Sequence, residues 1–201
     1  MSDPPLDREL VLEGLNLLAR LFWGPEGALC RDLWGPGPDL LAELARGLDD
    51  QGARAAVELA RRLGEYGSAE ALCRELEPAH VALFVSARGG IAASLYHSAY
   101  LEPGLLLGPP AREMARRLAR AGLEPSQGPG EPPDHLSLEL EYLAWLWEQG
   151  QDEQAADFAR GFLAPWLGEF GRRLAQGDPG GVFGLAARVV VSLVRVLGRT
   201  G

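Results

Sequence analysis

The sequence predicts an all-α fold, and three observations support this prediction. Apolar residues recur at helical spacing along most of the 201 residues. No stretch keeps the two-residue alternation of a strand for long, and β-branched residues are scarce before the carboxy-terminal segment. Clusters of glycine and proline divide the helical pattern into short segments. A chain of this length can bury one substantial core.

The amino-terminal segments are predicted from their leucines and from the residues that end each pattern. Trp23-Gly24-Pro25 ends the first helix, and Asp39 caps the second, after a Gly/Pro-rich connection. Pro78 should kink or divide the fourth helix, because proline removes a helical hydrogen bond. A later helix has a basic side that we interpret as a solvated face. The expected helices are residues 6–22, 39–48, 53–66, 68–85 and 110–122.

The carboxy-terminal part follows a breaker-rich segment. Residues 124–133 hold prolines and glycines in close succession, which predicts a hinge between an amino-terminal half, 1–123, and a carboxy-terminal half, 134–201. One helix follows Asp134, and residues 151–176 form a helix or a kinked pair. The last helix is expected over 182–197.

Composition limits the classes of function. The formal net charge is -9 and every basic residue among the Lys and Arg is arginine, so phosphate backbones are repelled and nucleic acid is not expected as a partner. Residues 1–5 lack the regions of a secretory signal. Residues 182–197 are interrupted by arginines and are shorter than the roughly 20 apolar residues of a membrane span. We therefore expect a cytoplasmic protein.

The two cysteines give no sign of a metal site. Cys30 and Cys73 lie in helix-like sequence without a CxxC spacing. We interpret them as two reduced, partly buried thiols.

Residues 131–147 combine rigid turn chemistry, ionisable groups and a strongly apolar helix. Pro132 and Pro133 donate no backbone hydrogen bond and keep the chain extended. Asp134 is expected to cap the helix that follows. Apolar residues cover several sides of that helix, which predicts a helix packed on more than one face.

This stretch closely resembles the Glu-Pro-x-Asp-His signature of the TorD/DmsD/NarJ family of cytoplasmic chaperones. A second block, residues 94–101 followed by Gly104 and Gly108-Pro109, is also similar to that family. The signature helix has Tyr142, Leu143 and Trp145 where methionine or phenylalanine is common. The resemblance implies a TorD-like helical bundle that matures molybdenum-containing redox enzymes and binds their twin-arginine export signals.

The resemblance also implies the site and the partners. The site is a groove for an arginine pair followed by an apolar helix, with Trp145 as part of its apolar wall. The implied partners are the twin-arginine leader and apoprotein of a molybdoenzyme catalytic subunit, without a cofactor, metal or catalytic residue. The protein would be a monomer or a homodimer, including one that exchanges halves. The implied peptide-binding residues are Tyr96, Ser98, Tyr100, Gly108, Pro109, Glu131, Pro132, Pro133, Asp134, His135 and Glu139.

Two other classes of function remain open on the residues alone. Asp134 and His135 could act as a general-base pair in a small all-α enzyme. His135 and Glu139 are one helical turn apart and could share a metal ion, and residues 77–80 match half of a di-iron motif. The other class is a plain helical adaptor, in which the tyrosines are core-edge residues. If residues 96–100 are helical, Tyr96 and Tyr100 share one face.

Overall fold

The computed structural model describes residues 7–86, 90–101, 106–123 and 130–199. Within them the only extended pairing is one antiparallel bridge between Tyr96 and His135, which confirms the all-α prediction. The helices are α1 (Arg8–Trp23), α2 (Gly27–Trp34), α3 (Gly37–Leu44), α4 (Asp50–Gly64), α5 (Ala69–His80), α6 (Ser98–Leu101), α7 (Pro109–Ala121), α8 (Leu136–Glu148), α9 (Asp152–Phe158), α10 (Ala164–Gly177) and α11 (Val182–Leu197).

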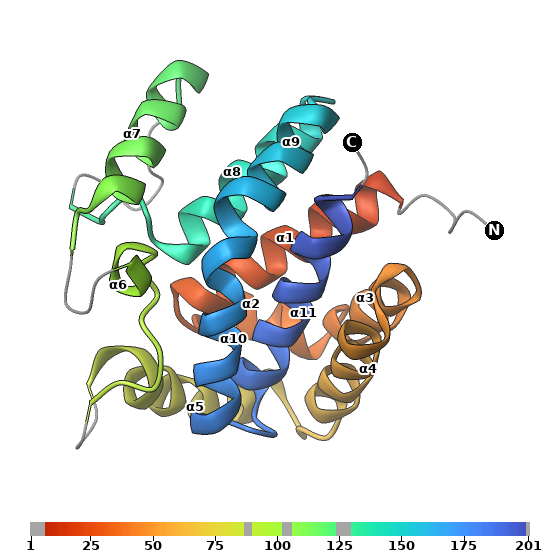
Figure 1. Cartoon of the computed structure of the whole chain (residues 1–201). Coiled ribbons are helices and arrows are strands. Elements are labelled where there is room, and N and C mark those ends of the chain that lie inside the picture. Colours follow the sequence, from red (N-terminus) through yellow and green to blue (C-terminus); the bar gives the residue numbers. More distant parts are fainter. Residues whose placement is uncertain (1–6, 87–89, 102–105, 124–129, 200–201) are drawn as a thin grey trace.

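The helices form a bundle around α1, α8, α10 and α11 (Figure 1). α1 packs along α8, and α11 packs against both α4 and α10. α3 and α4 lie on one side of the bundle, and α6 and α7 lie on the other. The centre holds a cluster of aromatic rings, in which Phe22 meets Phe170 edge-on at 5.6 Å and Phe84 meets Phe183 at 5.3 Å.

Local capping explains where several helices begin and end. Ser68 caps α5, its hydroxyl accepting from the amide of Ala71 at 3.2 Å, and the helix expected from position 68 begins there. Pro109 occupies the first turn of α7, where a missing amide hydrogen costs nothing. Gly122 ends α7 in the left-handed conformation, with φ of 68°.

Both long helical segments that were expected to be interrupted change to a π-helical turn part-way along. α5 continues through Pro78 and becomes a π-helical turn, Val81–Val85. A second π-helical turn, Ala159–Leu163, separates α9 from α10, which has Pro165 in its first turn. The 151–176 segment is therefore a kinked pair.

The structure corrects two expectations in the amino-terminal part. The sequence patterns did not predict α2, which is only eight residues long and has no side-chain cap. The interpretation of Cys30 and Cys73 as reduced thiols is wrong. They form a disulfide between α2 and α5, with 5.6 Å between their Cα atoms. Helix packing brings together cysteines 43 positions apart, which no local pattern reveals.

The division into halves stays a prediction. Most of the expected hinge, residues 124–129, lies outside the described residues. The pairs α1–α8 and α4–α11 each join a helix from before this segment to one from after it. In the described ranges no helix is both long and apolar enough to cross a membrane.

Candidate functional site

The two sequence blocks meet through the backbone. The amide of His97 donates to the carbonyl of Asp134 at 3.0 Å. The amide of Leu136 donates to the carbonyl of Leu95 at 2.8 Å. These two bonds flank the Tyr96–His135 bridge and fix the loop before α6 to the start of α8. The structure therefore brings together residues about forty positions apart in one cluster.

Asp134 joins three segments at the centre of this cluster. Its side chain is fully buried, and Oδ2 accepts from the amide of Ser98 at 2.8 Å and from its hydroxyl at 2.5 Å. The Ser98 hydroxyl oxygen accepts in turn from the amide of Gly108 at 3.0 Å. Hydrogen bonds to an ionised acceptor are stronger than neutral ones. Asp134 thus ties the start of α6 and the start of α7 to the signature.

The prediction that Asp134 caps the signature helix is wrong. α8 begins at Leu136, and the cap is His135, whose Nδ1 accepts from the amide of Ser137 at 3.2 Å. Asp134 lies one residue too early and its carboxylate turns to Ser98. The imidazole of His135 stacks on Trp23 with 4.3 Å between ring centroids and 6° between planes. Burial lowers the pKa of His135 to about 4, which agrees with a neutral ring whose Nδ1 accepts a hydrogen bond.

The turn before Asp134 presents a second carboxylate. Glu131, Pro132 and Pro133 are half-buried. The Tyr96 hydroxyl donates to Glu131 Oε1 at 2.6 Å, and burial followed by this bond raises the pKa of the phenol. The amide of His135 donates to the carbonyl of Pro132 at 3.1 Å, which closes the turn. Glu131 Oε2 has no partner among the described residues.

Glu139 belongs to a buried polar contact on the core side of the cluster. Its Oε1 lies 3.1 Å from His97 Nδ1, and its Oε2 accepts from the indole of Trp166 at 3.1 Å. Burial, and then the charge of Asp134, raises the pKa of Glu139 well above its ordinary value. Burial lowers the pKa of His97 to about 4. Both directions favour a neutral pair in which the protonated carboxyl donates to the imidazole.

The two tyrosines do not share a helical face. Tyr96 lies in the extended bridge before α6, whereas Tyr100 lies within that helix. The Tyr100 hydroxyl donates to the carbonyl of Ser94 at 2.7 Å, and the Arg173 guanidinium lies 5.0 Å from its ring. Both rings remain half-buried. The expectation of a shared face fails because the bridge replaces the helix at Tyr96.

The geometry does not assemble the alternative chemistries. The Asp134 carboxylate binds Ser98 and the His135 imidazole binds the Ser137 amide, so the two side chains do not form a general-base pair. Both oxygens of Glu139 are held by partners other than His135. Across the described ranges, no three His, Cys, Asp or Glu side chains form a group that could hold a metal ion.

Comparison with known proteins shows what this arrangement belongs to. The family described as the nitrate reductase delta subunit matches residues 45–172, more than half of the chain. The chain belongs to this family, which includes NarJ and TorD. The family resemblance read from the signature is thereby confirmed.

Curated relatives and a solved structure agree with the family. The chain is 34% identical over 111 residues to Chaperone protein TorD of Vibrio cholerae serotype O1, covering 50% of each. It is 32% identical over 133 residues to Chaperone protein TorD of Shewanella loihica, covering 63% of this chain and 62% of that one. The chain thus spans only about half the length of the first of these relatives. A crystal structure of a proposed redox enzyme maturation protein from Archaeoglobus fulgidus superposes with a TM-score of 0.55 and 24% identity, covering 97% of both chains, and supports the fold.

This member of the nitrate reductase delta subunit family exposes apolar side chains next to the cluster. Within the described residues, all the exposed large apolar side chains except Trp34 and Val57 lie between positions 81 and 107. They are Val81, Val85, Ile91, Leu101, Leu106 and Leu107, with exposed fractions of 42% to 63%. We call these six residues the apolar rim. Leu101 and Leu107 of this rim lie in the segments that Ser98 and Gly108 connect to Asp134.

Leu107 shows how the rim is held. Its φ is 55°, a left-handed conformation that a leucine adopts only at a cost of about 1–2 kcal/mol. The next residue is Gly108, whose amide is bound by the Ser98 hydroxyl. The Asp134 anchor therefore helps to hold a strained, exposed leucine in place.

Some members of the cluster were not expected from the sequence. Trp23, His97 and Trp166 were absent from the predicted site. Trp145, expected in the wall, stacks on Tyr142 about 15 Å along α8 from His135, at 1.5 Å per residue. Since Trp23 and Trp166 reach the cluster from distant helices, only packing reveals them.

Proposed function

We propose that the protein is a chaperone that binds the twin-arginine leader and apoprotein of a molybdopterin-containing redox enzyme. In this proposal it assists cofactor insertion and holds back premature export. It would act in the cytoplasm, where the leader is first available, and it would need no cofactor and catalyse no reaction. The family assignment and the curated relatives named chaperones support this choice.

The observation that carries the proposal is the anchor formed by Asp134, Ser98 and Gly108. It connects the segments that carry Leu101 and Leu107 of the apolar rim to the segment that carries the acidic turn at Glu131. A twin-arginine leader has the matching parts, because its arginine pair precedes an apolar segment. Rigid positioning of both surfaces lowers the ordering entropy lost on binding.

Glu131 is the carboxylate best placed for the arginine pair. It is half-buried and only one of its oxygens is engaged, by Tyr96. Partial burial and a fixed orientation strengthen a charge-assisted bond to a guanidinium. Asp134 is fully buried and holds Ser98, so we assign it a positioning role. His135 is buried between Trp23 and Tyr96 and would act in the same way.

The apolar rim would receive the apolar part of the leader. Tyr100 and the proline pair would line the passage between the acidic turn and the rim. An amphipathic or apolar helix laid on such a surface is a common mode of peptide recognition. The proposal keeps both a monomer and a homodimer open, and light scattering of the pure protein distinguishes them.

Calorimetric titration of a synthetic twin-arginine leader peptide tests the proposal. Wild type should bind this peptide and should bind a twin-lysine version more weakly, because lysine lacks the bidentate fork. Glu131→Gln should weaken binding by about tenfold or more, since a hydrogen bond to a charged group is worth about 1.5–3 kcal/mol. Glu148→Gln, an exposed charge at the far end of α8, is the matched control.

Two results would contradict the proposal. Equal binding by wild type and Glu131→Gln would remove the acidic turn from recognition. Failure of wild type to bind leaders from a panel of molybdoenzymes would remove leader binding altogether.

A further inference from the structure

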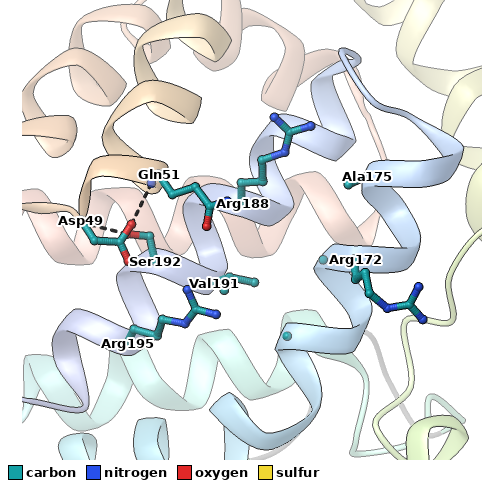
Figure 2. Close-up of a pocket in the computed structure, with 11 residues that line it drawn as sticks. Asp49, Gln51, Arg172, Ala175, Arg188, Val191, Ser192 and Arg195 are labelled. Atoms are coloured by element: carbon teal, nitrogen blue, oxygen red, sulfur yellow. Dashed lines mark hydrogen bonds between the residues drawn. The ribbon is translucent and has the colours of Figure 1, made fainter.

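A groove of about 260 Å³ lies between the start of α4 and the helices α10 and α11 (Figure 2). It shares no lining residue with the cluster around Asp134 or with the apolar rim. The proposed leader site does not use it.

The floor of the groove is made of small residues on α10. Gly168, Gly171 and Ala175 lie on the same face of this helix, at helical spacing. A Cβ added to Gly168 would meet nothing within 4 Å, whereas one added to Gly171 would lie 3.1 Å from Val191. Glycine is unfavourable inside a helix. Packing therefore does not require glycine at position 168. The absence of a side chain there leaves the groove open.

The wall of the groove is basic. Arg188 and Arg195 are two turns apart on α11, and Arg172 stands on α10. The only acidic lining residue is Asp49. Its carboxylate is already engaged, because it caps α4 by accepting from the amide of Gly52 at 2.9 Å. A basic groove in a protein of net charge -9 is a local reversal of sign.

The arginines differ in how far they are occupied. Arg172 pairs with Glu169 at 2.6 Å and extends away from the other two (Figure 2). Arg188 donates from Nη2 to the carbonyl of Pro179 at 2.7 Å, which leaves its other guanidinium nitrogens without a hydrogen-bond partner among the described residues. Arg195 forms no direct ion pair with a described residue, although its charge interacts with the Asp49 carboxylate across the groove. Arg188 and Arg195 are therefore the guanidinium groups available to a ligand.

We propose that this groove docks an acidic peptide segment, in which Asp or Glu carboxylates pair with Arg188 and Arg195. Guanidinium groups bind carboxylates through two parallel hydrogen bonds. The lining holds no aromatic ring on which a nucleobase could stack, which argues against a nucleotide as the ligand. The inference rests on the proposed function in one respect: the segment would belong to the folded part of the client apoprotein. The client would then be held at two separate places.

The test uses a short fluorescein-labelled oligoglutamate peptide and its oligoglutamine counterpart, followed by fluorescence anisotropy. Wild type should bind the glutamate peptide, with an affinity that falls as salt rises, and should bind the glutamine peptide far more weakly. The double variant Arg188→Gln/Arg195→Gln should weaken glutamate binding by about tenfold or more. The control Arg54→Gln/Arg74→Gln removes the same charge from exposed positions outside the groove and should change binding by less than about twofold.

A second variant keeps the test independent of the arginines. Gly168→Leu fills the groove without meeting a neighbour at its Cβ, and it should also abolish glutamate binding. Equal losses in the groove and control double variants would overturn the proposal, since net charge alone would then explain binding. Inorganic phosphate that binds while oligoglutamate does not would overturn it as well.

The twin-arginine leader peptide separates this inference from the proposed function. Leader binding should be unchanged in Arg188→Gln/Arg195→Gln and in Gly168→Leu. If the leader binds and oligoglutamate does not, the groove proposal fails and the chaperone proposal stands. If oligoglutamate binds in the groove and no leader binds, the acidic-ligand site stands and its assignment to a molybdoenzyme client fails.

Discussion

Removal of the Asp134 carboxylate tests the anchor of the candidate site most directly. Asp134→Ala deletes the acceptor of two hydrogen bonds from Ser98 and leaves a buried amide and hydroxyl without their partner. A buried donor left without its partner costs about 1–3 kcal/mol, so the loss of the acceptor for two donors costs about 2–6 kcal/mol. Because natural domains are stable by only about 5–15 kcal/mol, this loss is large. We expect the free energy of unfolding to fall by about 2–6 kcal/mol.

Asp134→Asn separates the shape of the anchor from its charge. The amide oxygen still accepts from Ser98, but the bonds lose their ionic character, so we expect a loss of about 1–2 kcal/mol. This value does not include loss of a helix cap, because His135 caps α8. Ser98→Ala should itself cost about 1–3 kcal/mol, since it also removes the acceptor of the Gly108 amide.

Urea unfolding followed by circular dichroism measures these values, with Glu13→Gln as an exposed control expected within about 0.5 kcal/mol of wild type. In a double-mutant cycle, Asp134→Ala and Ser98→Ala should couple by at least about 1 kcal/mol. Additive losses, or a loss below about 1 kcal/mol for Asp134→Ala, would refute the anchor.

Three further predictions concern buried groups away from the anchor. Burial lowers the pKa of His135 to about 4, so the unfolded chain binds a proton first as pH falls. Stability should then drop between about pH 6.5 and 4, and His135→Asn, which can still cap, should make this drop shallower in thermal melts without removing it, because burial also lowers the pKa of His97 to about 4. Burial raises the pKa of Glu139, so Glu139→Gln should be neutral or stabilising at pH 8 relative to pH 5, whereas Glu139→Ala should lose about 2–4 kcal/mol in urea unfolding at both. The disulfide closes a loop with a separation of 43 residues. Its removal in Cys30→Ala/Cys73→Ala should cost about 4 kcal/mol, and added reductant should bring wild type to the same midpoint. Unequal midpoints in reductant, an acid limb in His135→Asn as steep as that of wild type, or a Glu139→Gln variant weakened at pH 8 would each contradict its prediction.

The sequence by itself determined most of the helices. The apolar repeat over 182–197 corresponds to α11, and the start expected at 68 and the end expected at 122 agree with α5 and α7. These features depend on residues within a turn or two of one another, so a local pattern contains them. The two blocks that form the candidate site were also visible, through their resemblance to one family.

Only the tertiary structure decided what each polar side chain does. Asp134 was expected to cap the start of a helix, and it instead binds Ser98, 36 positions away. Cys30 and Cys73 were expected as thiols and are joined. In both cases the prediction failed because the partner of the side chain comes from a distant segment of the chain. A short pattern records how a segment folds on itself, whereas burial and partner choice depend on which distant segment packs against it, and here that packing sets both the anchor and the basic groove.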